Sequence, residues 1–537
     1  MEHFGAWGLI PPLLTIALAF ITKDVIISLF LGILSGALIV AGGNPALALI
    51  NTTDLLAGSL SDGWNIRIFL FCALLGGLVG MLSRTGSSSA LGHWASRHLK
   101  KRNSTLIATW FFGLLIFIDD YFNSLAVGTM MRPITDKQKI SRAKLAYILD
   151  STAAPVCIIA PVSSWVVTVM SVVKGSEGFG TLGVSEFSFF IRSIPYNMYA
   201  LLALIMVVVV SLTHRDFGPM AASERLAREQ GVLWNVERYG VASGEVDHEE
   251  NPRALARDML FPIIVLIVSA LVFFPLTTWM GAVDGESITS LGAAIASIPL
   301  GQAFNDTDAS VALFYSAVFT VSLTYLYYLA RRLLTIKTAS ESLKDGIGSM
   351  VPALIILTMA WTIGTVIKST PADGGLGLAR YLSEVVVGGG FPIWLLPGIV
   401  FALSALISFS TGTSWGTFTI MIPIVLPIVI ALGEVGSLTG GALLNATLIS
   451  VAAVLSGAVF GDHASPISDT TILSSTGAGC PHLEHVATQM PYALFIAGCS
   501  IIGFAVGGVF LNAIIGWIAA LAVFAAGMVI LPKTYKA

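Results

Sequence analysis

Long apolar runs, broken by short polar segments, occupy most of the 537 residues. A helix needs about 20 mostly apolar residues to cross a bilayer. Runs of this kind lie at 6–22, 25–42, 67–83, 145–172, 188–213, 258–280, 309–330, 348–368, 442–475, 487–511 and 512–531. The pattern therefore predicts an all-α polytopic membrane protein whose helices cross the lipid bilayer.

Composition supports the same class. Charged residues make up 11% of the chain and mean hydropathy is +0.85, whereas soluble domains carry roughly 25% charged residues. No basic patch indicates a nucleic-acid partner. The four cysteines are scattered without a C-x-x-C pair, which favours packing roles over redox or metal chemistry.

The distribution of positive charge predicts the topology, because Lys and Arg mark cytoplasmic loops. Positive clusters lie at 97–102, at 132–144, within 214–257 and at 331–344, and Lys533 and Lys536 follow the last run. Segments 43–66, 173–187, 281–308 and 433–440 are acidic or nearly free of Lys and Arg, so we expect them outside. The N-terminus is then outside and the C-terminus is cytoplasmic.

Two apolar segments have a polar centre that a simple crossing helix would not carry. Residues 105–131 are flanked by basic clusters on both sides and contain Asp119, Asp120, Asn123 and Ser124. A single crossing would place one basic cluster outside, so we expect a re-entrant hairpin with a polar tip. A second hairpin is expected at 395–427, around Ser410, Thr411, Thr413 and Ser414.

A long helix with a polar, proline-containing break follows each predicted hairpin. The first, at 145–172, contains Asp150-Ser151-Thr152-Ala153-Ala154-Pro155. The second, at 442–475, contains Gly461-Asp462-His463-Ala464-Ser465-Pro466-Ile467-Ser468-Asp469-Thr470-Thr471. A buried ionised group is costly in a membrane unless it is partnered, so such breaks are expected to line a polar site.

The order of these features predicts an internal repeat. Residues 1–213 and 258–511 each hold about five spans, one hairpin and one broken helix, and an odd number of spans makes the two repeats inverted, as in many secondary transporters. Residues 214–257 are expected to form a cytoplasmic polar linker. Residues 512–537 add one C-terminal helix and a tail.

The side chains at the breaks favour a cation. Asp119, Asp120, Asp150, Asp462 and Asp469 all fall there, and no Lys or Arg lies well inside a predicted span. Carboxylate and hydroxyl oxygens are suitable ligands for an alkali cation, and a buried carboxylate can bind a proton instead. We therefore expect Na+ and H+ as coupling ions without an organic cofactor, with Na+ held by Asp462, Asp469 and Asp150. The full predicted binding set is Asp119, Asp120, Asn123, Ser124, Asp150, Ser151, Thr152, Ser410, Thr411, Thr413, Ser414, Asp462, His463, Ser465, Asp469 and Thr470.

Several of these residues have a second interpretation. An Asp or Ser at a break can simply cap the next helix, and hydroxyls at a hairpin tip can bond back to their own helix. His463 is either a proton-linked group or a satisfied polar neighbour of the site. The sequence leaves these alternatives open.

Enzyme classes lack their motifs in this chain. There is no G-x-x-x-x-G-K-[ST] segment for ATP and no H-E-x-x-H segment for zinc. The residues before Asp462 are Val459-Phe460-Gly461, which differ from the G-x-G-D of intramembrane aspartyl proteases. We therefore expect a transporter and no enzymatic activity.

Two blocks resemble the NhaC-type Na+/H+ antiporter family within the ion-transporter superfamily. They are Ser410-Thr411-Gly412-Thr413-Ser414-Trp415-Gly416-Thr417 and the segment from Gly461 to Thr471. The resemblance implies hairpin-plus-broken-helix repeats, a scaffold domain, a moving transport domain and Na+ and H+ as coupling ions. It also implies that Asp462, Ser465, Asp469 and Thr470 lie in or near the site, and it favours a homodimer. Members of the family often have lysine where this chain has His463.

The sequence thus predicts a Na+(Li+)/H+ antiporter of a prokaryotic inner membrane. The alternative is a Na+-coupled transporter or exchanger of an amino acid or small carboxylate, since members of the broader family also carry such solutes.

Overall fold

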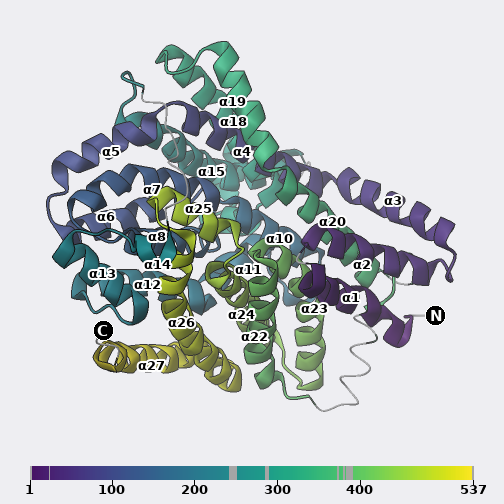
Figure 1. The fold of residues 1–537 in the computed structure, drawn as a ribbon. Coiled ribbons are helices and arrows are strands. Elements are labelled where there is room, and N and C mark those ends of the chain that lie inside the picture. Colours follow the sequence, from purple (N-terminus) through teal and green to yellow (C-terminus); the bar gives the residue numbers. More distant parts are fainter. Residues whose placement is uncertain are drawn as a thin grey trace.

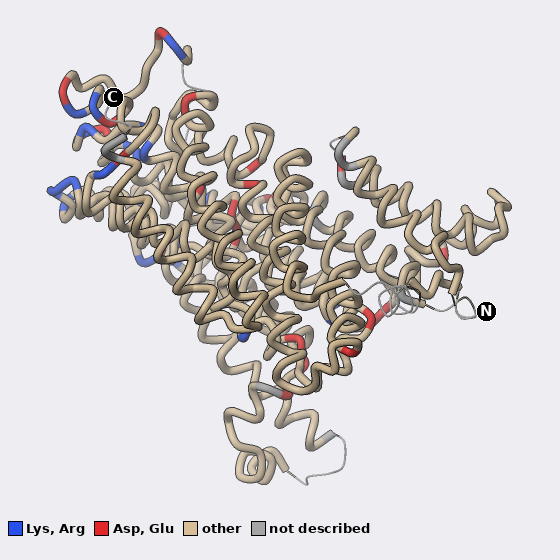
Figure 2. Tube along the Cα trace, turned by 90° about the horizontal axis from the view of Figure 1, so that it is seen from below, with Lys and Arg blue, Asp and Glu red and all other residues tan. Residues whose placement is uncertain are grey.

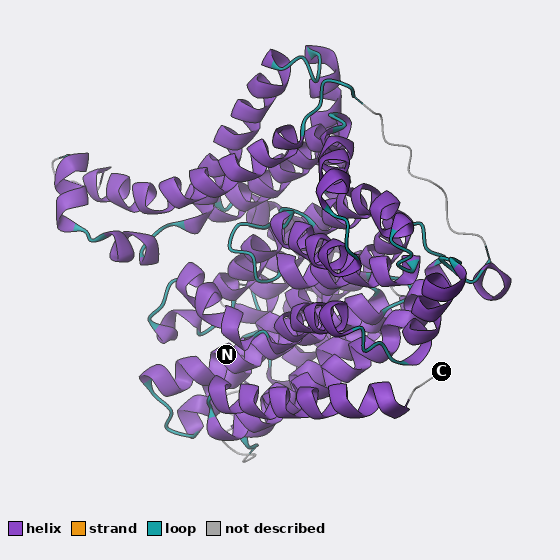
Figure 3. Ribbon diagram, turned by 90° about the vertical axis from the view of Figure 1, so that its left-hand side faces the viewer, coloured by secondary structure: helices purple, strands orange, loops and turns teal. Residues whose placement is uncertain are grey.

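The computed structural model describes residues 3–22, 24–240, 251–284, 290–369, 371, 374–378, 381 and 391–534, and every regular element in these ranges is helical (Figure 3). The elements before the predicted linker are η1 (Gly5–Leu9), α1 (Ile10–Thr22), α2 (Val25–Val40), α3 (Pro45–Ser61), α4 (Gly63–Arg84), α5 (Ser87–His98), α6 (Arg102–Leu115), α7 (Asp120–Lys137), α8 (Arg142–Thr152), α9 (Ala154–Cys157), α10 (Ser164–Gly175), η2 (Phe179–Leu182), α11 (Glu186–Ser193), η3 (Ile194–Tyr196) and α12 (Met198–Thr213).

The later elements begin in the linker. They are α13 (Gly218–Gln230), α14 (Val236–Tyr239), α15 (Ala256–Asp284), α16 (Leu291–Ser297), α17 (Leu300–Asn305), α18 (Ala309–Ala330), α19 (Ile336–Ser349), α20 (Val351–Lys368), η5 (Ile393–Leu395), α22 (Leu396–Thr411), α23 (Ser414–Val435), α24 (Gly440–Ala464), α25 (Asp469–Ala478), α26 (His482–Phe510) and α27 (Ala513–Thr534). The N-terminal helices α1–α3 and the C-terminal helix α27 lie on different sides of the molecule (Figure 1).

Nine helical segments of the described residues are long and apolar enough to cross a membrane, or ten if the bent pair α19–α20 forms one span. The protein is therefore an all-helical polytopic membrane protein, as predicted. Lys and Arg gather at one end of the molecule, near the C-terminus, whereas Asp and Glu also occur deep among the helices (Figure 2).

Some predicted spans and loops differ from the structure. α1 and α2 have 13 and 16 residues, which correspond to about 20 and 24 Å of helix. The segment 43–66, predicted as an outside loop, contains the 17-residue helix α3, which packs on α2, α4 and α20. Asn44 caps α3 by accepting hydrogen bonds from the amides of Ala46 and Leu47. The helix was missed because Asn, Thr and Asp side chains interrupt its apolar run.

The predicted linker also contains packed structure. α13 buries Met220, Ser223, Glu224 and Ala227 and packs on α8 and α26. Glu224 pairs with Arg102 and accepts a hydrogen bond from the amide of Ser141 at 2.9 Å. The polar residues of α13 therefore include buried ion-pair partners, and this part of the linker is not simply a solvent-exposed loop. Residues 241–250 of the linker lie outside the described residues.

The helices are interrupted at each of the four predicted polar segments. α6 ends before residues 116–119, α8–α10 are separated at 153 and 158–163, α22 and α23 at 412–413, and α24 and α25 at 465–468. α7 packs against α25, and α10 packs against α23. Each hairpin therefore contacts the broken helix from the other part of the chain. The arms of the second hairpin, α22 and α23, are themselves among the span-length helices.

Helix α24 forms the centre of this arrangement. Within its span, 89% of the residues are buried, the highest value among the nine span-length segments. It packs on α12, α22, α23 and α26. A Cβ placed on Gly457 would lie 2.3 Å from the carbonyl oxygen of Phe401, and one on Gly461 would lie 2.5 Å from that of Ala405. Both glycines are therefore required for the close approach of α22 to α24.

This close packing predicts that Gly461→Ala destabilises the protein. The added methyl group meets backbone atoms of α22 rather than a flexible side chain, and overpacking of this kind costs about 1–3 kcal/mol. We expect a lower thermal unfolding midpoint in detergent, measured by intrinsic fluorescence. Gly441→Ala in the same helix is the matched control, because a Cβ there meets nothing within 4 Å. Equal midpoints for the two variants would contradict the packing argument.

Candidate ion-binding site

The Asp462 carboxylate lies at the end of α24 and joins two of the interruptions. Its Oδ2 accepts hydrogen bonds from the Ser414 hydroxyl at 2.7 Å and the Ser414 amide at 3.3 Å, at the start of α23. Its Oδ1 accepts from the Ser468 hydroxyl and, at 3.4 Å, from that of Thr470. The residue is 4% exposed. Hydroxyls and one helix N-terminus therefore hold this carboxylate.

Two further carboxylates come from the interruption between α6 and α7. Asp119 caps α7 by accepting a hydrogen bond from the amide of Phe122 at 2.9 Å. Asp120 accepts one from the indole Nε1 of Trp165 in α10 at 3.3 Å. The carboxylate of Asp120 also lies close enough to that of Asp462 for electrostatic repulsion. The two parts of the chain thus bring acidic groups to one centre.

Tyr121 connects this centre to α25. Its phenol donates a hydrogen bond to Oδ2 of Asp469 at 3.2 Å. The same phenol experiences the charges of Asp119, Asp120, Asp462 and Asp469. We call these four aspartates, together with Ser414, Ser468 and Thr470, the acidic centre. Asp469 is exposed, whereas the other three aspartates are buried.

Basic side chains do not neutralise the acidic centre. In the described part of the chain, no Lys or Arg forms an ion pair or hydrogen bond with any of its four aspartates. A search of the described residues for three or more His, Cys, Asp or Glu side chains arranged to hold a metal ion finds no such group. A cation here would therefore need hydroxyl and backbone oxygens beside one or two carboxylates.

Other predicted site residues have structural partners. Asn123 donates from Nδ2 to the carbonyls of Gly113, Ile116 and Thr152 at 2.7–2.9 Å, which ties the α6–α7 interruption to the end of α8. Ser124 bonds to Ser474 at 3.1 Å and Ser465 bonds to the carbonyl of Phe409 at 2.8 Å. These residues hold the interruptions together.

The remaining predicted hydroxyls bond mainly within their own helices. Thr152 donates to Ile148, and Ser410 and Thr411 both donate to Ile407 at 2.8–2.9 Å. Thr413 caps α23 through the amide of Gly416 at 3.4 Å. Of the predicted tip residues in this hairpin, Ser414 alone bonds to Asp462.

Asp150 lies in a second buried cluster. Its Oδ2 is 3.2 Å from Nε2 of His485 and accepts a hydrogen bond from Gln489 at 2.7 Å. Gln489 also donates to the backbone carbonyl of His463, whose ring contacts Ser151 at 3.2 Å and Tyr199 at 2.7 Å. Asp462, Asp469 and Asp150, predicted to hold one Na+ together, are thus divided between two hydrogen-bonded groups.

Sequence reasoning missed several members of both groups. His485 and Gln489, the partners of Asp150, occur at i and i+4 of α26, so a polar pair on one face of an apolar helix was a readable signal. Ser468 lies inside the segment from Gly461 to Thr471 but is not among the predicted binding residues. Tyr199 and Trp165 meet the sites only through tertiary packing and carry no local signal.

Lys144 ends the basic cluster that predicts a cytoplasmic loop at 132–144, just before the predicted span 145–172, yet its side chain is not on an exposed surface. It is fully buried in α8, forms an ion pair with Asp216 and lies 5.9 Å from the centre of the Tyr147 ring. Asp216 also accepts a hydrogen bond from Tyr492 at 2.8 Å. Asp216, the partner of Lys144, follows α12 in the linker, so the local sequence around Lys144 does not reveal the ion pair.

These interrupted helices, meeting around buried acidic groups in an all-helical membrane fold, define a secondary transporter. The sequence profile of the Na+/H+ antiporter family matches residues 156–509. The chain belongs to this family, which confirms the predicted resemblance.

Three known proteins are similar to this chain. An uncharacterised protein of Haemophilus influenzae is 36% identical over 523 residues, which cover 96% of this chain and 93% of that protein. The malate-2H+/Na+-lactate antiporter of Bacillus subtilis is 28% identical over 233 residues, which cover 42% of this chain and 44% of that protein. The crystal structure of the YdaH transporter of Alcanivorax borkumensis is similar in fold, with a TM-score of 0.50 at 15% identity, covering 84% of this chain and 91% of that one.

The buried ion pair predicts a strong dependence of stability on Lys144. Lys144→Met leaves Asp216 buried without its cation, which costs about 3–5 kcal/mol, so we expect a markedly lower thermal midpoint. The double variant Lys144→Met/Asp216→Asn should recover most of the loss, because both charges are gone. Lys337→Met, at a side chain that is 84% exposed, is the control. An unchanged midpoint in the single variant would show that the pair does not stabilise the fold.

Proposed function

We propose that this transporter exchanges Na+ or Li+ for protons, with the cation bound at the acidic centre. The observation that carries the proposal is the Asp462 carboxylate, which is buried and partnered by hydroxyls and one amide without a basic side chain. Neutral donors stabilise the negative charge but leave it in place. A monovalent cation or a proton would compensate it.

The helix N-termini at the centre favour a cation over an anion. The first turn of a helix attracts negative groups because its amides are unpaired. Asp119 occupies this position at α7, Asp462 at α23 and Asp469 at α25. The protein's own carboxylates already fill these anion sites. The C-terminal ends of α6 and α24 carry the partial negative charge of a helix end, which attracts a cation.

Exchange follows from competition at one carboxylate. A carboxylate in a low-dielectric environment binds a proton more readily than one in water, and a bound cation makes that proton unnecessary. Asp462 would alternate between a protonated form and a cation-bound form, with Asp119 and Asp120 completing the site. Asp150 would contribute through its charge, which acts on Asp462. Among the described residues, the two carboxylates have different hydrogen-bond partners.

The recurring order of hairpin and broken helix supports two inverted repeats at about 1–213 and 258–511. The reciprocal packing of α7 on α25 and α10 on α23 is the arrangement expected of two such halves. The gathering of Lys and Arg at the end near the C-terminus favours a cytoplasmic C-terminus in a prokaryotic inner membrane (Figure 2). We also propose that the protein forms a homodimer.

Asp462→Asn tests the proposal in proteoliposomes that contain a pH-sensitive dye. We expect the wild-type protein to alkalinise an acidic interior when Na+ or Li+ is added outside, and not when K+ or choline is added. Asp462→Asn should lose this response by at least an order of magnitude, since one interaction with a buried charge is worth about 1.5–3 kcal/mol. Full activity in the variant would reject Asp462 as the cation ligand.

Asp308→Asn is the matched control. Asp308 caps α18 by accepting hydrogen bonds from Ser310 and Val311, and asparagine caps helices equally well. This control should retain wild-type flux, with an unchanged thermal midpoint.

The alternative function is Na+-coupled transport or exchange of an amino acid or small carboxylate. Similarity to the malate-2H+/Na+-lactate antiporter is the observation in its favour. In this case the hydroxyls around Asp462 and the N-terminus of α23 would bind the solute while a nearby carboxylate binds Na+.

Thermal stability separates the two functions, because a ligand that binds the folded state stabilises it by mass action. We expect Na+ or Li+ alone to raise the unfolding midpoint. Malate, lactate and a panel of amino acids should add nothing when Na+ is present. A saturable further rise with one organic solute, together with no cation-dependent proton flux, would favour the alternative.

A further inference from the structure

Two adjoining cavities open beside α4 and α20. One has a volume of about 510 Å³ and lies between α2, α3 and α4, and the other, of about 300 Å³, reaches α10 and α23. Asp62, Asn65 and Thr365 line both cavities. We call the combined space the vestibule. Its walls adjoin segments 43–66 and 173–187, which are poor in Lys and Arg.

The charges around the vestibule favour a cation. Asp54 and Asp62 contribute carboxylates to its wall. Lys174, the basic residue of the smaller cavity, is paired with Glu186 at 3.3 Å and lies 4.7 Å from the centre of the Trp64 ring. Its charge is therefore largely compensated. The net effect is a negative potential that concentrates small cations at this surface.

The vestibule approaches the acidic centre along two helices. Ser171 of α10 and Pro423 of α23 line its inner wall. Trp165, which bonds to Asp120, lies six residues before Ser171, about 9 Å along α10. Ser414, which bonds to Asp462, lies nine residues before Pro423, about 14 Å along α23. Both helices connect the cavity wall directly to the carboxylates.

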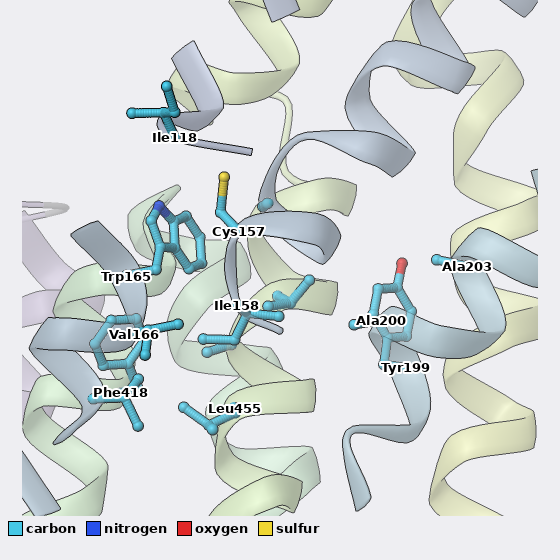
Figure 4. Close-up of a cluster of buried hydrophobic side chains, with 14 of the residues drawn as sticks. Ile118, Cys157, Ile158, Trp165, Val166, Tyr199, Ala200, Ala203, Phe418 and Leu455 are labelled. Carbon is cyan, nitrogen blue, oxygen red and sulfur yellow. The ribbon is translucent and has the colours of Figure 1, made fainter. Parts of the chain in front are cut away.

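Aromatic rings of α10 and α23 form a cluster near the acidic centre. The rings of Trp165, Trp415 and Phe418 lie 6.0–6.1 Å apart, centre to centre. Trp165 and Phe418 are fully buried, and Figure 4 shows one above the other along one side of the apolar cluster, with the indole nitrogen directed toward the segment of Ile118. That nitrogen donates the hydrogen bond to Asp120 at 3.3 Å. The aromatic barrier is thus bonded to the acidic centre.

We propose that the vestibule is the outer access route for the transported cation and that Trp165 closes it through its hydrogen bond to Asp120. A cation at the acidic centre competes with the indole N–H for the same Asp120 oxygen. Occupancy of the site is therefore coupled to release of the Trp165 ring. The inference rests on the proposed cation exchange for its substrate, whereas the position of the access route does not depend on which solute is carried.

Cysteine labelling tests the route. Thr365 is exposed in the vestibule and the four native cysteines are buried. We expect Thr365→Cys to react with a membrane-impermeant, positively charged thiosulfonate from the outer face, and to lose at least 90% of its flux once labelled. Ser316→Cys, at a fully buried position in α18, should not react. Labelling from the cytoplasmic face only, or complete labelling with full flux, would overturn the route.

Replacement of Trp165 tests the coupling. Trp165→Phe keeps an aromatic ring but removes the N–H donor, so Asp120 becomes free to bind the cation. We expect the Na+ concentration for half-maximal flux to fall about tenfold, the value of one hydrogen bond to a charged group. Trp94→Phe is the control, because this indole is 51% exposed in α5 and lines neither cavity of the vestibule. Its half-saturation should stay unchanged.

The outcomes separate this inference from the proposed function. A purely structural role for Trp165 would lower the amount of active protein without tightening Na+ binding, so an unchanged or higher half-saturation in Trp165→Phe overturns the coupling. Asp462→Asn in the Thr365→Cys background should lose cation-driven flux yet react with the reagent as before. If the wild-type protein shows no cation-driven flux, the proposed function fails, while the labelling pattern still decides the access route.

Discussion

The structure depends on the buried carboxylate of Asp462, which receives hydrogen bonds but has no Lys or Arg partner among the described residues. Ser414, Ser468 and Thr470 satisfy the oxygens of Asp462 without neutralising them. In the interior of a membrane protein such a charge is costly, so the folded state tolerates it best with a proton or a cation bound. In the proposed function, the same charge that is costly to the fold is the group that binds the cation or the proton.

The interruptions in the helices supply the hydrogen-bond donors of Asp462. A continuous helix bonds its own amides and carbonyls and offers none to a neighbour. By ending α22 and α24 near one another, the chain presents the N-terminus of α23 and two hydroxyl-bearing turns to Asp462. The close approach requires Gly457 and Gly461, where any side chain would collide with the backbone of α22. The end of α24 must therefore carry both the glycines that allow close packing and the carboxylate of Asp462.

Much of this could be predicted from the sequence, because the relevant signals are local. The segment from Gly461 to Thr471 contains the carboxylate and two of its hydroxyl partners within nine residues, and the polar interruptions stand out against apolar flanks. Pairings across long distances could not be predicted: Asp150 with His485, Lys144 with Asp216, and Asp120 with Trp165. Periodicity shows that one face of a helix is polar but not which helix it meets.

The helix α3 and the packed part of the linker were missed for a related reason. Their polar residues were interpreted as loop signals, although Asn44 caps a helix and Glu224 is buried against Arg102. The predicted Na+ trio of Asp462, Asp469 and Asp150 assumed that carboxylates at equivalent interruptions converge. In the structure Asp462 and Asp469 both belong to the acidic centre, where Asp469 accepts a hydrogen bond from Tyr121 of α7, whereas Asp150 bonds to His485 and Gln489 of α26.

The central claim is that one buried centre exchanges protons for a cation, and proton release on binding tests it most directly. Purified protein in weakly buffered detergent solution would be titrated with NaCl, LiCl and choline chloride while the released protons are counted with a pH indicator. The account predicts saturable release of at least about half a proton per protein with Na+ or Li+ at a pH where the centre is protonated, and none with choline. Saturable Na+ binding by calorimetry without proton release, or no Na+ binding at any pH, would contradict it.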